Sequence, residues 1–250
     1  MVCCLVLCSD LRSDKTDIAA SPVSSTTILS DDCLSFNILN NKIRDSKISK
    51  AEALKQFQSL LPKIRLYFYQ NGGKNFPESA WVFPLESYDA KAIGGTNGNG
   101  YITSKYNYFD GNKHFGHPAH DIFIRDKNQD GIDDLSNKPV NVLSMTGGIV
   151  IAAETVWGQS SELRGGKYIW IYDPYSNSLY YYAHNNAIFV QPSDIIKPGD
   201  IIATVGRTGS NAFKKRSPTH LHIMQLKLDS NNNPGPNNCY GVLTKVKAMK

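Results

Sequence analysis

The sequence predicts a mainly β protein with a compact antiparallel sheet and an N-terminal α-helical lead-in. From about residue 80 onward, short segments rich in β-branched and aromatic residues alternate with Gly, Pro, Asn and Asp. Before that point, one stretch places apolar residues at helical spacing. At 250 residues the chain can bury one substantial core or two small ones without cross-links.

Composition divides the chain into four segments. Residues 1–45 combine an apolar N-terminus with a polar linker, and residues 46–79 are the helical segment. Residues 80–228 are the β-rich domain, and residues 229–250 are a C-terminal extension.

The N-terminus is apolar from Val2 to Cys8 but lacks a preceding basic region and a following small-residue cleavage site. It fits an atypical or truncated export signal, or equally a plain buried segment. Residues 9–45 are rich in Ser, Asp, Thr and Asn without sustained periodicity, which predicts a loosely structured lead-in.

The first regular element is predicted from residue 46 onward. Ser49 is a candidate N-cap, because Glu52 follows it at the capping-box position. The helix is expected to end near Pro62. Its apolar residues recur at helical spacing: Ile48, Ala51, Leu54, Phe57 and Leu61.

The β-rich domain contains a series of expected strands. A turn over Pro174 to Asn177 is expected to join two of them, and DSNNNPGPNN, at 229–238, is expected to be a loop. The expected strands lie in AWVFPL, HDIFIRD, VNVLSM, GGIVIAAETVW, KYIWIYDP, SLYYYAH, DIIATVGRTG and HLHIMQLKL.

Charge and composition exclude several classes of protein. The hydrophobic fraction of 41% and the charged fraction of 20% are ordinary for a globular protein. The net charge of +5 is spread along the chain without a basic stripe, which argues against nucleic-acid binding. No apolar run approaches the ~20 residues of a transmembrane helix.

Five cysteines are present, three of them crowded near the start. Cys33 and Cys239 are the two that lie outside that cluster. A disulfide between them is one possibility if the protein is exported, and two unpaired thiols are the other.

The six histidines all lie in the β-rich domain, and two of them stand in THLHI, at 219–223. On a strand, His220 and His222 point to the same face about 6.6 Å apart. That spacing lets one imidazole bind a metal ion while the other stands beside it.

The stretch HPAHD, at 117–121, offers further ligands. On a straight strand His117 and Asp121 would be about 13 Å apart, too far to share an ion, so the chain must bend between them. Pro118 is the expected site of this bend, and a strand is expected to follow it, with Asp121 at the start of that strand. Two imidazoles and one carboxylate form a set that holds zinc and leaves a fourth position open, as in catalytic sites.

In order along the chain, HPAHD, GGIVIAA, YYAH, IKPGDIIATVGRTG and THLHI resemble the motifs of the lysostaphin and LytM type of zinc metallopeptidase. The resemblance spans about residues 80–228. It implies a zinc metallopeptidase domain of the duplicated hybrid motif type, with an open groove and peptidoglycan peptide bonds as substrates. It further implies that His117, Asp121 and His222 bind zinc, while His184 and His220 are catalytic.

The sequence departs from the family pattern at a few positions. Ala119 replaces a frequent glycine, and KKRSPTH replaces a short Gly-Pro approach to the last motif. His114 offers a rival register for the first motif, but the residue four positions on is Pro118, which cannot ligate. His120 is expected to face away from the ligands, with a surface role favoured over a groove role.

No HExxH glutamate is present, so general-base and oxyanion roles are expected to fall to His184 and His220, in an order that the sequence leaves open.

A second metal ion is a further hypothesis. DKNQDGIDDLSN, at 126–137, resembles an acidic calcium loop, although it lacks the bidentate glutamate. Its candidate calcium ligands are Asp126, Asn128, Asp130 and Asp134.

We therefore expect a zinc metalloendopeptidase acting on peptidoglycan stem peptides or cross-links. A non-catalytic relative that binds peptidoglycan or regulates an amidase is the alternative, and a peptidase acting outside the wall is a third hypothesis. Export to the periplasm, cell envelope or extracellular space is expected from the substrate class. The oligomeric state and the bond cleaved are left open.

Overall fold

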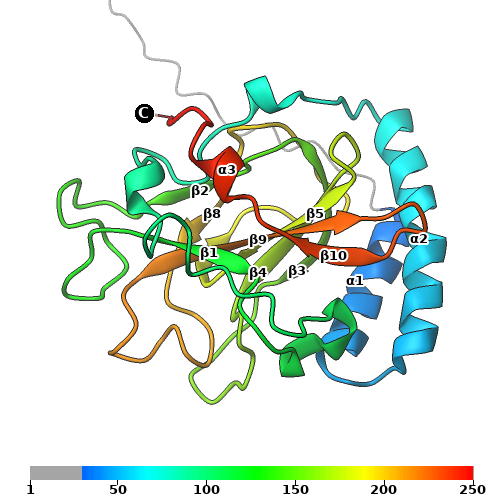
Figure 1. Ribbon diagram of the computed structural model, residues 1–250, viewed down its shortest axis with the longest axis horizontal. Helices are drawn as coiled ribbons and strands as arrows, with labels where there is room; N and C mark the ends of the chain where they lie inside the picture. The colour runs from blue at the N-terminus through cyan, green and yellow to red at the C-terminus, as the bar shows by residue number, and fades with distance from the viewer. Residues whose placement is uncertain (1–29, 250) are drawn as a thin grey trace, which may run out of the picture.

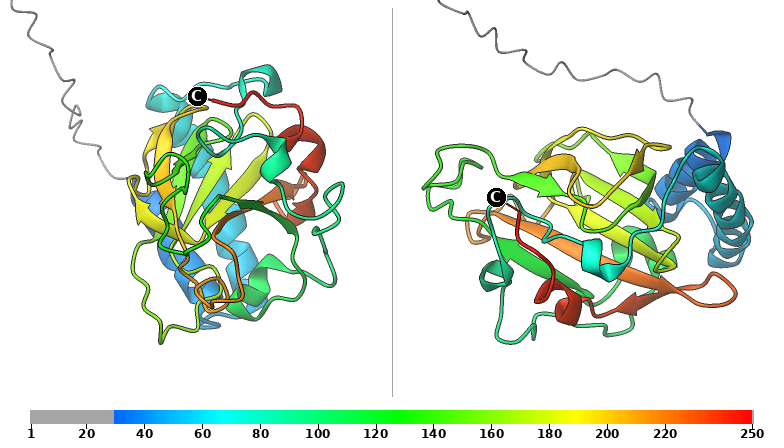
Figure 2. Two further views of the ribbon diagram at one scale, coloured as in Figure 1. Left: turned by 90° about the vertical axis from the view of Figure 1, so that its left-hand side faces the viewer. Right: turned by 90° about the horizontal axis from the view of Figure 1, so that it is seen from above.

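The computed structural model describes residues 30–249, so the predictions for the apolar N-terminus and for the linker up to residue 29 lie outside the described residues. Two helices, α1 (Asp31–Arg44) and α2 (Lys50–Gln70), precede the β-rich part. They lie side by side against one side of it (Figures 1 and 2).

Helix α1 corrects the expectation that residues 9–45 are loosely structured. Ser30 caps it by accepting a hydrogen bond from the Cys33 amide at 3.4 Å, and Asp31 and Asp32 lie in the first turn, where helices favour negative charge. Periodicity did not reveal this helix, because the apolar Ile38 is exposed and the polar Asn40 is buried. The buried residues of the helix are Cys33, Phe36, Leu39, Asn40 and Ile43.

Helix α2 begins as predicted and ends later than predicted. The Ser49 side chain accepts a hydrogen bond from the Glu52 amide at 3.3 Å, which confirms the cap. The helix continues through Pro62 to Gln70. An internal proline costs about 3 kcal/mol, so burial of Ile64 and of other apolar side chains in the last turns offsets that cost.

The main sheet is antiparallel and has the strand order β1-β9-β5-β4-β3-β7. The long strand β9 pairs with β5 along one side, and with β1 and then β10 along the other. The strands are β1 (Ala119–Phe123), β3 (Gly148–Glu154), β4 (Tyr168–Asp173), β5 (Ser178–Ala183), β7 (Ile195–Ile196), β9 (His220–Leu228) and β10 (Pro234–Asn237).

A second, smaller sheet has the order β2-β8-β6 and is also antiparallel. Its strands are β2 (Asn141–Leu143), β6 (Asn185–Ile188) and β8 (Ile201–Val205). Short helices complete the described chain: η1 (Glu78–Ala80), η2 (Ala90–Ala92), η3 (Tyr108–Lys113) and α3 (Tyr240–Leu243).

The predicted fold class, mainly β with helices before it, is confirmed. The turn predicted at 174–177 joins β4 to β5. Two local expectations were wrong: residues 80–85 make only isolated bridges, and part of the expected loop at 229–238 forms β10. Strand β10 starts with Pro and lies at the sheet edge, where a missing amide donor is tolerated.

The main sheet separates two hydrophobic cores, because side chains alternate between its faces. On one face, α1 and α2 bury their apolar stripes against Trp170 of β4 and Met224 and Leu226 of β9. On the other face, Leu221 and Ile223 of β9 pack with residues of the smaller sheet. The sheet therefore carries the helices on one face and the smaller sheet on the other.

Cys33 and Cys239 are both buried and unpaired, and they belong to these two different cores. A disulfide between them is therefore excluded in this fold, and the alternative of two free thiols holds.

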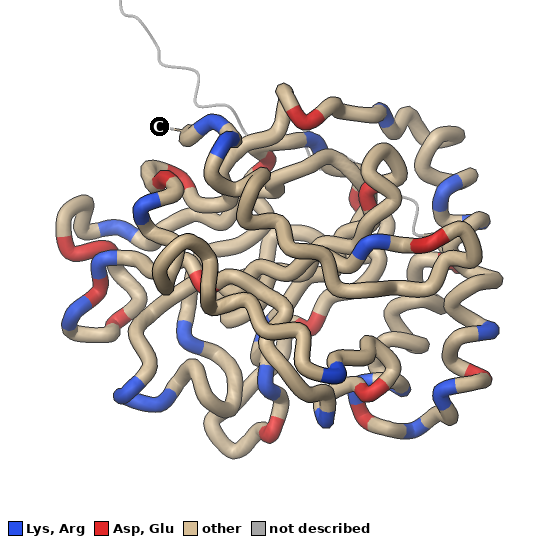
Figure 3. Tube along the Cα trace, viewed as in Figure 1, with Lys and Arg blue, Asp and Glu red and all other residues tan. Residues whose placement is uncertain are grey.

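In the view of Figure 3, Lys and Arg are interspersed with Asp and Glu along the described chain. Among residues 30–249, no helix combines the length and the apolar character that crossing a membrane requires.

The packing of α2 on the sheet leads to a stability prediction. Phe57 is fully buried and contacts the rings of Phe36, Tyr108 and Phe109, so Phe57→Ala is expected to lower the free energy of unfolding by about 3–5 kcal/mol in urea titration. Leu66→Ala, at an exposed position of the same helix, is the control and should change it by about 0.5 kcal/mol or less. Equal effects of the two substitutions would contradict the packing.

Candidate metal centre

The three residues expected to bind metal come together at one end of the main sheet. Asp121 of β1 is directly opposite His222 of β9 in the strand register. His117 lies just before β1, and candidate ligand atoms of all three residues lie within 4.8 Å of one another. Among residues 30–249 this is the only such group of His, Cys, Asp or Glu side chains.

The chain before β1 brings His117 within reach of Asp121. His117 and Ile102 exchange backbone hydrogen bonds of 2.6 and 2.9 Å, and Pro118 interrupts the strand between that bridge and β1. Strand β1 starts at Ala119, two residues before Asp121. The Nε2 atom of His117 lies 3.3 Å from Oδ1 of Asp121.

Hydrogen bonds orient the ligand rings. Nδ1 of His117 donates to the Gly100 carbonyl at 3.0 Å, which directs Nε2 towards Asp121. Nδ1 of His222 lies 3.1 Å from the same carboxylate oxygen, Oδ1 of Asp121. Two imidazole nitrogens therefore converge on one carboxylate oxygen, and an outer carbonyl fixes the tautomer of His117, as is usual around metal ligands.

His184 and His220 lie beside this group. Nε2 of His220 is 3.7 Å from Oδ1 of Asp121, and the rings of His184 and His220 have centroids 4.8 Å apart. Their Nδ1 atoms hydrogen-bond to carbonyls at 2.7 Å, to Thr208 for His184 and to Pro218 for His220. All five residues named from the sequence thus line one cavity of about 220 Å³.

Local backbone geometry places His184. It stands between β5 of the main sheet and β6 of the smaller sheet, and its φ of 67° lies in the left-handed region. Such a conformation is uncommon for a residue other than Gly, and its amide is held by the Gly165 carbonyl at 3.0 Å. The chain therefore changes direction at His184, where it passes from β5 to β6, and this directs the imidazole into the cavity.

Burial and charge shift the protonation of these groups. Burial lowers the pKa of His222 to about 4, and burial with the neighbouring imidazoles lowers the pKa of His184 well below its usual value. Burial acts to raise the pKa of Asp121, but hydrogen bonds from His117 and His222 lower it overall. Near neutral pH His184 is therefore neutral, and the two ligands Asp121 and His222 are ionised and neutral, respectively, the forms in which they bind metal.

The two additional histidines lie outside the group. His120 faces away from Asp121, as expected, but it is buried, not at the surface: its Nε2 lies 2.9 Å from Oδ1 of Asn238 and its ring stacks on Tyr101. His114 lines the cavity without joining the ligand group, and burial with the charge of Arg164 lowers its pKa.

The calcium hypothesis is not supported. Asp126 uses its carboxylate within the protein, accepting hydrogen bonds from the amides of Asp130 and Gly131 and from the Thr219 hydroxyl. Asp130 likewise accepts from Asn128 and from a backbone amide, and Asp134 from the Lys127 amide. These carboxylate oxygens stabilise the turn within residues 126–137. The hydrogen bond from Thr219 to Asp126 connects this turn to the residue just before His220.

Sequence analysis missed the cation in this cavity. Arg164 lines it and donates a hydrogen bond from its guanidinium to the His114 carbonyl at 2.6 Å. It lies in the segment after β3, outside every motif, so only its closeness in the fold reveals it. The Thr208 carbonyl that orients His184 lies within the IKPGDIIATVGRTG motif, but a backbone carbonyl has no sequence signal of its own.

Comparisons with known proteins found one matching family model and several similar solved structures. Residues 127–234, which include His184, His220 and His222, match the family model described as Peptidase family M23. Among solved structures, the catalytic domain of lysostaphin from Staphylococcus simulans is similar at 21% identity, covering 54% of this chain and 83% of that one, with a TM-score of 0.37.

Two further structures are similar. A putative glycyl-glycine endopeptidase LytM from Ruminococcus gnavus shares 18% identity over 89% of this chain and 90% of that one, with a TM-score of 0.46. A zinc-containing peptidase from Vibrio cholerae shares 20% identity over 65% of this chain and 39% of that one, with a TM-score of 0.38. Through the match of residues 127–234 and the group formed by His117, Asp121 and His222, this chain is a metallopeptidase similar to peptidase family M23.

Proposed function

We propose that this protein is a zinc-dependent endopeptidase that hydrolyses peptide bonds in the stem peptides or cross-links of bacterial peptidoglycan. The observation that carries the proposal is that His117, Asp121, His184, His220 and His222 line one cavity. The family match supports a peptidase, and two of the similar structures are described as an antimicrobial peptidase and a putative glycyl-glycine endopeptidase. The resemblance of the sequence motifs supports peptidoglycan peptides as substrates.

The donor set fits zinc. His117 and His222 offer nitrogen atoms and Asp121 offers an oxygen atom, a combination that zinc accepts. Zinc held by these residues would polarise a substrate carbonyl and make a water molecule more acidic. Near neutral pH the His222 imidazole is neutral and the Asp121 carboxylate is ionised, and both states favour binding of a cation.

His220 and His184 can handle protons in the reaction. Each has its Nδ1 engaged with a backbone carbonyl, which places the proton there and leaves Nε2 free as an acceptor. Nε2 of His220 is the nearer of the two to the metal group, at 3.7 Å from Asp121 Oδ1. We propose His220 as the residue that takes a proton from water, and His184 as the partner whose Nε2 accepts a hydrogen bond from that water or from the N–H group of the scissile amide.

Domain limits and location follow as proposals. We propose residues 80–228 as the metallopeptidase domain, preceded by the helical segment 46–79 and followed by the extension 229–250, whose strand β10 pairs with β9. Action on peptidoglycan requires export, so we propose a periplasmic, cell-envelope or extracellular location.

Removal of a ligand tests the metal site. His117→Ala is expected to weaken zinc binding by more than the roughly 10- to 100-fold that loss of an outer hydrogen-bond partner costs. His114→Ala removes an imidazole from the same cavity but outside the ligand group, and should bind zinc as the unaltered protein does. Competition with a chromogenic chelator measures both, and equal affinities would refute the assignment.

Loss of either proton-handling imidazole tests the chemistry. His184→Ala and His220→Ala are expected to keep zinc but lower release of muropeptides from purified peptidoglycan by about 10²–10⁴-fold. Zinc content by atomic absorption is measured on the same samples. Normal release by both variants would exclude their catalytic role, and zinc-loaded unaltered protein that releases nothing would favour the non-catalytic alternative.

The contact behind His184 gives a third test. Gly209 has a φ of 116°, and a Cβ atom there would lie 2.9 Å from Nδ1 of His184 and 2.4 Å from the Arg164 carbonyl. Gly209→Ala is therefore expected to displace His184 and to lower kcat/KM by about ten- to a hundredfold with zinc retained. Gly158→Ala, where a Cβ atom meets open space, is the control. Unchanged kinetics in Gly209→Ala would show that this contact does not set the ring position.

A further inference from the structure

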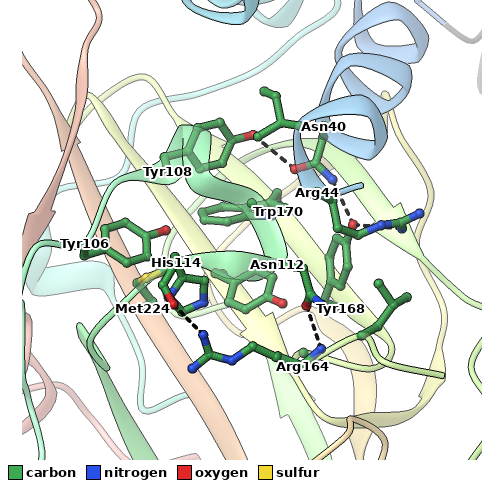
Figure 4. A pocket seen from close by; sticks show the side chains of 15 residues that line it. Asn40, Arg44, Tyr106, Tyr108, Asn112, His114, Arg164, Tyr168, Trp170 and Met224 are labelled. Atoms are coloured by element: carbon green, nitrogen blue, oxygen red, sulfur yellow. Dashed lines mark hydrogen bonds between the residues drawn. The ribbon is translucent and has the colours of Figure 1, made fainter. Parts of the chain in front are cut away.

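A second cavity adjoins the metal cavity on the same face of the main sheet. The two share His114, Arg164, Gly165, Tyr181 and Met224 in their walls. The second one lies between the end of α1, the η3 segment and strands β4 and β5, and Figure 4 shows its lining side chains. It therefore extends the groove from the metal residues towards the N-terminal helices.

The wall of this cavity is aromatic and held in place by hydrogen bonds. Asn40 of α1 accepts a hydrogen bond from the Tyr108 hydroxyl at 3.0 Å and donates one to the Tyr168 hydroxyl at 2.9 Å. The ring of Trp170 packs edge-on against Tyr108, with centroids 5.5 Å apart. These contacts link α1, η3 and β4, so the helices before the β-rich part build one side of the cavity.

Arg164 stands where the two cavities meet. Its side chain is partly buried and gives one guanidinium hydrogen bond, to the His114 carbonyl (Figure 4). Within residues 30–249 no carboxylate lies within ion-pair distance, 4.0 Å, of this guanidinium. Its amide is anchored by Oδ1 of Asn112 at 2.9 Å. The backbone is thus fixed while most guanidinium donors are unused.

The other cation in the wall is already neutralised. Arg44 of α1 forms ion pairs with Glu154 at 2.6 Å and with Asp45 at 2.7 Å. Across the lining of both cavities the only carboxylate is that of Asp121, which belongs to the metal group. The adjoining cavity therefore carries one unbalanced positive charge, at Arg164, and no acidic side chain.

We propose that the adjoining cavity binds a part of the substrate peptide that bears a free carboxylate. Arg164 is the specificity-determining residue that recognises this carboxylate. This inference rests on the proposed peptidase function and names the chemistry of its substrate. A guanidinium offers paired donors that match the two oxygens of a carboxylate, and a partly buried site strengthens that interaction. The aromatic wall packs against the neighbouring apolar part of the peptide.

The test compares soluble cross-linked muropeptides with the same material after its free carboxylates have been converted to carboxamides. The unaltered protein is expected to cleave the carboxylate form with a kcat/KM about ten- to a hundredfold higher, mainly through a lower KM. Arg164→Gln is expected to cleave both forms equally, and Arg164→Lys to keep part of the preference. Melting temperature and zinc content verify that each variant is folded and loaded.

Lys167→Gln is the matched control. It removes a positive charge on the same segment from a residue that lines neither cavity, so the preference should remain. Equal cleavage of both forms by the unaltered protein, or the same preference in Arg164→Gln, would overturn the inference while leaving the peptidase function standing.

Binding separates the inference from the proposed function. Calorimetric titration of the zinc-loaded His220→Ala variant with both forms, with and without Arg164→Gln, reports recognition without turnover. If the unaltered protein cleaves nothing, the peptidase proposal fails, yet tighter binding of the carboxylate form that depends on Arg164 still supports the inference. Equal or absent binding of the two forms overturns it.

Discussion

The pairing of β1 with β9 is the constraint on which the rest of the site depends. Because Asp121 stands opposite His222 in that register, the carboxylate and the imidazole project from the same face of the sheet. A slip of one residue would turn His220 and His222 to the opposite face, into the core beneath the smaller sheet. Leu221 and Ile223, which are fully buried in that core, oppose such a slip.

One face of the main sheet serves two purposes. Towards one end of β9, Met224, Leu226 and Leu228 pack in the core beneath the helices, while His220 and His222 at the other end line the metal cavity. The cavity with Arg164 lies where these two regions meet. The N-terminal helices therefore both stabilise the sheet and limit the length of its open groove.

Much of this could be predicted from the sequence, since HPAHD, YYAH and THLHI combine distinctive residue types with strand patterns. Helix α1 could not, because the polar Asn40 lies on its buried side and the apolar Ile38 on its exposed side, and both weaken its apolar periodicity. The end of α2 was misplaced because tertiary burial outweighed the local effect of Pro62. The role of Arg164 could not be predicted either, because nothing in the sequence around this loop arginine shows that it lines the cavity with the histidines. The assignment of roles to His117, Asp121, His184, His220 and His222 stays a prediction that the geometry supports.

The central claim is that two imidazoles and one carboxylate from β1, β9 and the segment before β1 hold the metal ion. Zinc-edge X-ray absorption of the loaded protein tests it most directly, since it reports the number and type of ligands. The account predicts nitrogen and oxygen ligands at about 2.0–2.2 Å, two of them imidazoles, with no sulfur. A sulfur shell at about 2.3 Å, or a shell of three or four imidazoles, would contradict it.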